Sequence, residues 1–301
     1  RFLSEKAGTK ATRRVLDNET VSFDQDLWRS VAEMGWLGVS IPEAHGGLGL
    51  GRLELCVLAE ELGRALAPIP YSSTVYFLAE ALMLAGGEQQ KAALLPKIVS
   101  GDCIGCFAMS EGPGAASPAN IASTFENGTL TGAKIPVTDG DCASHAVVLA
   151  KEGAGLSLVL VDLGQPGVSR TVLKTVDPSR GHAKLEFRAV KAERLGAMGQ
   201  GWELAEAVLD RAAVLLAFEQ LGGSQACLEM AMDYAKNRYA FSRPIGSFQA
   251  IKHKLADMYV AIEVARSNAY YGAWALSTEA GELPFAAAAS RAAASDAYYL
   301  C

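Results

Sequence analysis

The spacing of the apolar residues changes twice along this chain of 301 residues, and this restricts the fold more than any other feature. Over residues 1–105 apolar residues recur every three or four positions, which predicts helices. Over residues 106–195 short β-prone runs alternate with Gly, Asp, Asn and Pro, which predicts strands. From residue 196 the helical spacing returns. We therefore expect a mainly α protein with an N-terminal α-helical domain (1–105), a middle β domain (106–195) and a C-terminal helical bundle (196–301) truncated at its end.

The β-prone runs follow one another with only turns between them. They read GTLTGAKIPVT, HAVVLA, LSLVLVDL and HAKLEFRAV. A parallel sheet needs a helical crossover between its strands, and none is present here. We therefore expect an antiparallel barrel or sandwich.

The C-terminal third is predicted to contain three long helices. The first ends near Asn237, and the second begins in the stretch SFQAIKH. Between them, Pro244 and Gly246 predict a tight reversal of the chain. A third helix is expected to begin after the segment GELP at residues 281–284.

Composition argues against several classes of protein. The formal charge is −6 and the Lys and Arg residues are scattered, so nucleic acid is not an expected partner. No apolar run reaches the ~20 residues of a membrane span, and the N-terminus lacks a signal pattern. We expect a cytoplasmic protein.

No metal centre or hydrolytic site is predicted. The six cysteines do not form the dense framework of a small secreted domain, so we expect free thiols. Cys103 and Cys106 have C-x-x-C spacing without a second pair of ligands, and the four histidines form no ligand pattern. The glycine run at residues 46–51 follows no strand, which favours a turn over a dinucleotide site.

Two segments are candidate ligand contacts, CFAMSEGPGAASPAN and LTGAKIPVTDGDCASHAVVLA. The small residues of the first would let a ligand approach the backbone closely. For both segments a simple surface loop or strand pair is the alternative.

These segments, with IPEAHGGLGLGRLELCVLAEELGR and RYAFSRPIGSFQAIKHKLADM, resemble the acyl-CoA dehydrogenase family over essentially the whole chain. The resemblance implies an N-terminal helical domain, a small antiparallel β-barrel and a C-terminal four-helix bundle, usually in a tetramer. It also implies FAD, held between the β domain and the bundle and reached by a neighbouring subunit.

The resemblance assigns three groups of site residues. Those facing FAD in the same subunit are Phe107, Met109, Ser110, Pro136, Val137 and Thr138. Those donated to the FAD of a neighbour are Arg238, Phe241, Phe248 and Gln249. Those on the substrate side are Ser117, Asp210 and Arg211. A guanidinium suits the donated role because it binds pyrophosphate through paired charged hydrogen bonds.

The family reaction is the α,β-dehydrogenation of an acyl-CoA thioester, in the degradation of fatty acids or steroid side chains. A carboxylate removes the α-proton, the β-hydrogen leaves as hydride to the flavin, and an electron-transfer flavoprotein reoxidises it. The acyl group itself is not marked by any motif.

Four positions depart from the family pattern. Pro136 replaces a tryptophan, residues 111–118 read EGPGAASP in place of a loop with Ser-Asp, and Ala213 replaces an arginine. Ala212 matches the position where a minority of members carry the catalytic glutamate. The base therefore lies beyond Cys301 or is absent, and no catalytic residue is named.

These departures affect the half of the FAD site that a subunit builds for itself, while the donated half is intact. One hypothesis is a non-catalytic partner subunit of a heteromeric enzyme, and the alternative is a tolerated variation in an ordinary homotetramer. A CoA-thioester binding module without flavin and an oxidase or monooxygenase on the same fold are further alternatives.

Overall fold

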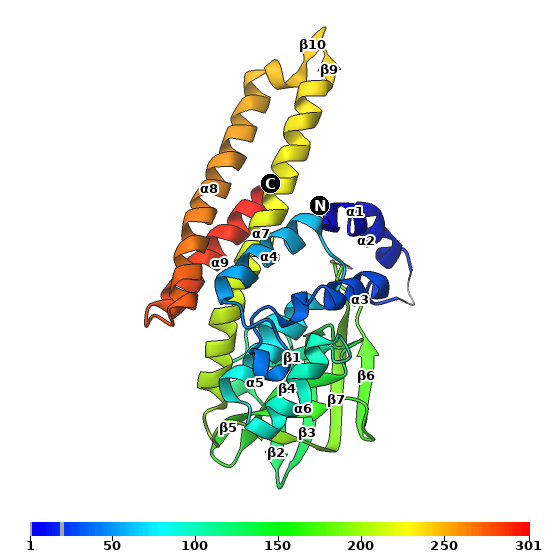
Figure 1. The fold of residues 1–301 in the computed structure, drawn as a ribbon, viewed down its shortest axis with the longest axis vertical. Helices are drawn as coiled ribbons and strands as arrows, with labels where there is room; N and C mark the ends of the chain where they lie inside the picture. The colour runs from blue at the N-terminus through cyan, green and yellow to red at the C-terminus, as the bar shows by residue number, and fades with distance from the viewer. Residues whose placement is uncertain (1, 19–20, 178) are drawn as a thin grey trace. The chain divides into compact units, whose positions relative to one another are not determined.

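The computed structural model describes residues 2–18, 21–177 and 179–301, and residue contacts divide the chain into two compact units. Unit 1 comprises Arg1–Thr9, Gly51–Ala67 and Ala213–Cys301, and unit 2 comprises Lys10–Leu50 and Pro68–Ala212. Figure 1 shows helices, then strands, then helices along the chain, which confirms the predicted order. Both predicted domain boundaries, near residues 105 and 195, fall inside unit 2 and stay predictions.

Helices and short helical turns precede the sheet in unit 2. They are α2 (Thr9–Leu16), α3 (Gln25–Glu33), η1 (Trp36–Gly38), η2 (Glu43–His45), the π-helical η3 (Ser72–Ala79), α5 (Glu80–Ala85) and α6 (Glu88–Val99). Asp24 begins α3 because its side chain accepts a hydrogen bond from the backbone N–H of Leu27 at 3.0 Å. The turn predicted in the glycine run 46–51 is confirmed.

The sheet of unit 2 has eight strands and is mostly antiparallel. They are β1 (Gly105–Ala108), β2 (Thr124–Glu126), β3 (Thr129–Thr138), β4 (His145–Glu152), β5 (Gly155–Asp162), β6 (Val168–Val172), β7 (His182–Lys191) and β8 (Glu193–Leu195). The order is β6-β7-β3-β2-β4-β5-β8. Strand β1 pairs in parallel with β4, alongside the single parallel bridge from β2 to β4. The antiparallel β domain is thus confirmed, with β2, β6 and β8 as strands that were not individually predicted.

Strands β4 and β5 are buried on both faces. Val147 and Leu149 pack with helices α5 and α6 in one core, whereas Val148 and Ala150 pack with β3 and β7 in a second core. Successive side chains of a strand point to opposite faces, so a strand between two cores requires a continuous apolar run. This explains the sequence HAVVLA, and Figure 1 shows α5 and α6 beside the sheet.

Unit 1 consists of helices joined by one small hairpin. Its elements are α1 (Phe2–Lys6), α4 (Arg52–Ala65), the later part of α7 (Gly201–Asn237), β9 (Tyr239–Ala240), β10 (Arg243–Pro244), η5 (Ile245–Ser247), α8 (Gln249–Ser277) and α9 (Leu283–Leu300). The predicted reversal between α7 and α8 is confirmed as the β9–β10 hairpin followed by η5 (Figure 1). The short η4 (Pro118–Asn120) lies in unit 2, in the loop after β1.

Helices α4 and α7 approach each other closely at two glycines. A Cβ on Gly63 would lie 1.9 Å from the carbonyl oxygen of Glu219, and one on Gly222 would lie 1.8 Å from that of Glu60. Only glycine permits such a contact between helix backbones. Helices α8 and α9 also meet through small residues, since a Cβ on Gly272 would lie 2.4 Å from Ser290 Oγ.

Among the described residues, none of the helices combines the length and the hydropathy that a membrane span requires. All six cysteines are free, as predicted. Cys103 is buried, and burial raises the pKa of its thiol to about 11. Since the thiolate is the ligand and nucleophile, this burial does not favour the metal or redox alternative for the C-x-x-C pair.

Candidate functional site

Two predicted cofactor segments lie side by side in unit 2, although they are distant in sequence. The backbone N–H of Ile135 in β3 donates to the carbonyl oxygen of Ser110 at 2.8 Å, and Glu111 forms a bridge with Ile135. Lys134 Nζ also donates to the carbonyl oxygen of Met109 at 3.1 Å. The loop that follows β1 therefore runs along the C-terminal half of β3.

The side chains of β3 divide between a core and the exposed surface. Pro136 and Thr138 are exposed, whereas Val137 is fully buried in the core of the sheet. The strand alternation requires this division. Val137 can thus offer a ligand only its backbone. The predicted contact of Val137 with FAD is therefore restricted to its main-chain atoms.

The predicted residues of β1 and its loop are half-buried. The ring of Phe107 packs against that of Phe77, with 5.7 Å between the ring centroids. Met109 and Ser110 are half-buried next to it. A small cavity of about 260 Å³ is lined by residues 110–116 and Asn120, which are mostly small.

A buried ion pair that the sequence did not reveal holds this loop. Lys134 Nζ lies 2.6 Å from Glu111 Oε1, and the side chain of Lys134 is fully buried. Glu111 also accepts hydrogen bonds from the backbone N–H groups of Ala122 at 2.6 Å and Ser123 at 3.0 Å. Both ends of the loop are thereby joined to β3.

The Glu111 carboxyl is held in its ionised form. Burial by itself would raise its pKa, but hydrogen bonds from Lys134 Nζ and from two backbone N–H groups hold that pKa below its ordinary value. Burial lowers the pKa of the Lys134 ammonium, although Glu111 opposes this. A charged pair with these extra donors satisfies the condition under which a buried ion pair is tolerated.

Ser117, a predicted substrate contact, lies in the same loop directly before η4. Its backbone N–H donates to Asn120 Oδ1 at 2.8 Å, and Asn120 Nδ2 donates to the carbonyl oxygen of Ala115 at 3.1 Å. These bonds fix a local turn. Contact between Ser117 and a substrate stays a prediction.

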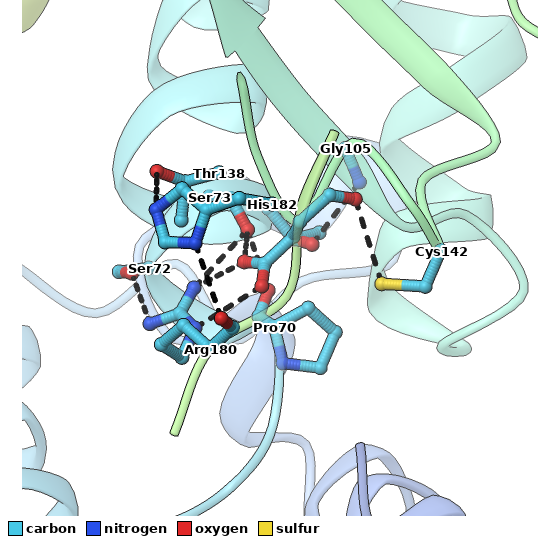
Figure 2. A network of polar contacts seen from close by, with 10 residues as sticks. Pro70, Ser72, Ser73, Gly105, Thr138, Cys142, Arg180 and His182 are labelled. Carbon is cyan, nitrogen blue, oxygen red and sulfur yellow. Dashed lines mark hydrogen bonds and ion pairs between the residues drawn. The ribbon is translucent and has the colours of Figure 1, made fainter. Parts of the chain in front are cut away.

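A second polar network, also missed by the sequence analysis, surrounds the end of β3 (Figure 2). Arg180 Nε donates to Asp139 Oδ1 at 3.1 Å, and its Nη1 donates to Ser72 Oγ at 2.9 Å. Ser73 Oγ donates to the other oxygen of Asp139. Asp139 is only 3% exposed, so this network ties η3 to the turn after β3. The sequence signal was Asp139 beside Gly140, which indicated a turn but not its partners.

The predicted substrate pair on α7 has a local structural role. Arg211 Nη1 donates to the carbonyl oxygen of Ala207 at 3.0 Å, and its Nε lies 3.9 Å from a carboxylate oxygen of the buried Glu80. Burial and the nearby Glu206 raise the pKa of the half-buried Asp210 carboxyl, while Arg211 opposes this. The sequence did not predict that Arg211 balances the negative charge of Glu80. Contact with a substrate stays a prediction for Asp210 and Arg211.

Ala212 follows this pair and is buried at 1% exposure. The position that holds a glutamate in a minority of the family therefore carries no proton acceptor.

Within the described parts of the chain, no group of three metal-ligating side chains is present.

The four remaining predicted residues lie on the hairpin region of unit 1. Phe241 is 91% exposed, Arg238 and Gln249 are exposed, and Phe248 is half-buried. The rings of Phe241 and Phe248 meet edge to face at 6.2 Å. Arg243 lies 4.1 Å above the ring of Phe248. An exposed cluster of aromatic and cationic groups is typical of a binding surface.

A larger cleft of about 1170 Å³ contains none of the predicted site residues. It is lined by the start of α6 and the ends of several strands, with Lys97, His145, Asp162, Lys191 and Glu193 among its residues. Burial lowers the pKa of His145. Charges of both signs are mixed there, so volume alone does not make it the functional site.

Two family models match this chain. The acyl-CoA dehydrogenase N-terminal domain matches residues 1–102, and the acyl-CoA dehydrogenase C-terminal domain matches residues 199–301. The chain is 34% identical over 271 residues to the mitochondrial isovaleryl-CoA dehydrogenase of Solanum tuberosum, covering 84% of this chain and 66% of that protein. It is 35% identical over 269 residues to acyl-CoA dehydrogenase FadE27 of Mycobacterium tuberculosis, covering 88% of this chain and 70% of that protein.

Solved structures share the fold. The Tcur3481-Tcur3483 steroid ACAD is 34% identical with a TM-score of 0.89, covering 99% of this chain and 81% of that one. The ChsE4-ChsE5 complex from Mycobacterium tuberculosis is 30% identical with a TM-score of 0.88, covering 98% and 80%. The chain therefore belongs to the acyl-CoA dehydrogenase family, which is FAD-dependent. It spans about two thirds of the length of the curated relatives named above.

Proposed function

We propose that this chain binds FAD and takes part in the α,β-dehydrogenation of an acyl-CoA thioester. The observation that carries the proposal is the hydrogen bond from the Ile135 N–H to the Ser110 carbonyl oxygen. It brings the loop after β1 next to the end of β3, which contains Pro136 and Thr138. The loop and this end of β3 are the two segments that the resemblance assigns to the flavin. This junction exposes a hydroxyl on Thr138, an apolar ring on Pro136 and the backbone of a loop of small residues.

These groups fit an isoalloxazine ring. A flat ring needs apolar contact on its face and hydrogen-bonding groups at its edge, and Pro136 and Thr138 offer one of each. The loop at residues 112–116 contains no large side chain, so its backbone is accessible to a ligand. When bound, FAD would supply the hydride acceptor, and an electron-transfer flavoprotein would be the expected partner for its reoxidation.

A second candidate function is favoured by the altered residues of the flavin segments. Pro136 stands where the family pattern has a tryptophan, and residues 111–118 read EGPGAASP in place of a loop with Ser-Asp. In contrast, the hairpin residues assigned to a neighbour's FAD are present and exposed. These two observations support a partner subunit in a heteromeric acyl-CoA dehydrogenase, in which this chain supports FAD binding in the other chain. Two solved relatives, the Tcur3481-Tcur3483 steroid ACAD and the ChsE4-ChsE5 complex, are each named for two proteins, which favours the same arrangement.

The visible absorption spectrum tests both candidates. The protein is purified alone and after co-expression with a paralogous chain from the same genome, and the flavin content per chain is measured. A single-chain product with one FAD, which is bleached anaerobically by an acyl-CoA, would establish the homo-oligomeric enzyme. A colourless product that gains FAD and bleaching only with the paralogue would establish the partner subunit.

Two controls complete this experiment. Reoxidation of the bleached protein is compared with air and with an electron-transfer flavoprotein, because rapid reaction with oxygen would indicate an oxidase instead. Absence of FAD from both preparations would contradict the proposed function in either form.

A further inference from the structure

Thr138 and His182 face each other at one end of the β3–β7 pair. Thr138 Oγ1 lies 3.2 Å from His182 Nε2. Figure 2 marks this contact with a dashed line. Thr138 is exposed and His182 is half-buried. The proposed function uses the hydroxyl of Thr138 but gives no role to His182.

The second ring nitrogen of His182 determines the direction of this hydrogen bond. His182 Nδ1 lies 3.1 Å from the carbonyl oxygen of Arg180. A carbonyl oxygen only accepts, so Nδ1 must carry the hydrogen. A neutral imidazole has one N–H group, so Nε2 is an acceptor and the Thr138 hydroxyl donates to it.

The carbonyl that orients His182 is itself held firmly. The guanidinium of Arg180 is bound by Asp139 and Ser72. The backbone N–H of Asp139 donates to the carbonyl oxygen of Gly181 at 2.7 Å. The segment between Arg180 and His182 is therefore fixed by side-chain and backbone bonds, which makes one ring orientation of the histidine preferred.

We propose that His182 is a positioning residue that fixes the hydrogen of the Thr138 hydroxyl and leaves Oγ1 to act as an acceptor toward the bound ligand. The identity of that ligand, FAD, rests on the proposed function. The edge of an oxidised isoalloxazine is rich in acceptors, and reduction turns N5 into an N–H donor. A hydroxyl that only accepts therefore favours the reduced form of the bound group.

The histidine tautomer is measured directly in the protein without ligand. The chain has four histidines, so ¹⁵N-histidine labelling gives few signals, and His182→Gln identifies the one of interest. The expected result is that Nδ1 carries the hydrogen and Nε2 does not. A neutral Nε2–H tautomer or a doubly protonated ring would overturn the proposal, whether or not FAD binds.

The reduction potential of the bound FAD tests the consequence. In His182→Phe the Thr138 hydroxyl is free to donate, so the affinity ratio of reduced to oxidised FAD should fall by about threefold to tenfold. This corresponds to a decrease of ~15 to ~30 mV for a two-electron couple. His45→Gln, a histidine outside this network, should leave the potential unchanged.

A double-mutant comparison shows whether His182 acts through Thr138. In a Thr138→Val background, His182→Phe should produce no further decrease. An equal decrease in both backgrounds, or none in either, would overturn the proposal. If His182→Phe does not fold, His182→Gln replaces it. The amide oxygen of the glutamine can still accept from Thr138, so the reduction potential should stay near the wild-type value. A tenfold change in the affinity ratio of reduced to oxidised FAD would contradict the inference. If neither preparation binds FAD, the proposed function fails and the tautomer measurement alone decides the inference.

Discussion

At the scale of single residues, the loop after β1 depends on one buried charge. Lys134 has a fully buried side chain, and its partner Glu111 is 12% exposed. Alternation along β3 would not have predicted a lysine in a core position. The pair became recognisable only when the loop and the strand were placed together, because Glu111 precedes Lys134 by an entire loop and strand.

Lys134→Met should destabilise the fold by about 3 kcal/mol, since it leaves the Glu111 carboxylate partly buried without its cation. Urea denaturation measures this change. Lys184→Met is the matched control, because Lys184 pairs with Glu186 at 2.8 Å while its side chain is 36% exposed. Loss of such a surface pair should change the stability much less, because solvent screens the interaction. Similar decreases in the free energy of unfolding of both variants would contradict a special contribution of the buried pair.

The same pair predicts a dependence of stability on pH. The pKa of Glu111 is lower in the folded protein than its ordinary value. Its stabilising contribution is therefore fully present above the unfolded-state pKa of about 4.3 and is lost as the pH falls through the lower folded-state value. Glu111→Gln should be less stable than wild type at neutral pH, and this difference should shrink below about pH 4. Urea midpoints measured between these pH values check the sign.

At the scale of secondary-structure elements, glycine permits the contact between α4 and α7. The sequence predicted both helices, and it contained Gly63 and Gly222 as ordinary breaks in helix propensity. Propensity alone makes glycine unfavourable inside a helix by about 1 kcal/mol relative to alanine. The close approach of the two backbones supplies the reason for these residues.

Gly222→Ala should destabilise unit 1 by about 2 to 3 kcal/mol despite the better helix propensity of alanine, because its Cβ collides with the backbone of α4. Gly281→Ala is the control, since a Cβ there meets nothing within 4 Å. Thermal midpoints of both variants test this expectation. A raised midpoint for Gly222→Ala would show that the helices separate without cost.

At the scale of the whole molecule, the predicted site residues belong to two compact units. The residues of β1, its loop and β3 lie in unit 2, whereas Arg238, Phe241, Phe248 and Gln249 lie in unit 1. The hairpin cluster is exposed, so its side chains contribute little to the stability of the unit that carries them. The proposed donated role requires this exposure, because only an exposed side chain can reach the flavin of a neighbouring subunit.

Arg238→Ala and Phe241→Ala should each change the unfolding free energy of the single chain by no more than ~0.5 kcal/mol, as is usual for exposed side chains. In the assembled, flavin-bearing protein Arg238→Ala should lower the affinity for FAD by about tenfold or more, since charged hydrogen bonds to a phosphate are among the stronger ones. Phe241→Ala should also lower this affinity, because it removes the apolar contact of the ring. Lys252→Ala, an exposed cation on α8, is the control. Unchanged FAD affinity in Arg238→Ala would contradict the donated role.

The sequence by itself determined the order of helices, strands and helices, the main strands β3, β4, β5 and β7, and the hairpin between α7 and α8. These features are encoded locally, since periodicity and turn residues act over a few positions. The motifs also indicated the family, and through it the segments at Ser110 and Thr138. The family and the fold class are confirmed, while the residue roles remain proposals.

Only the tertiary structure decided which side chains meet. Lys134 with Glu111, Arg180 with Asp139, and His182 with Thr138 each join separate elements, and no short-range pattern records such pairs. It also showed that Val137 points into a core while its neighbours are exposed. The physical reason is that burial and hydrogen bonding depend on the packing of distant segments, whereas the sequence pattern reports only the preferences of each segment alone.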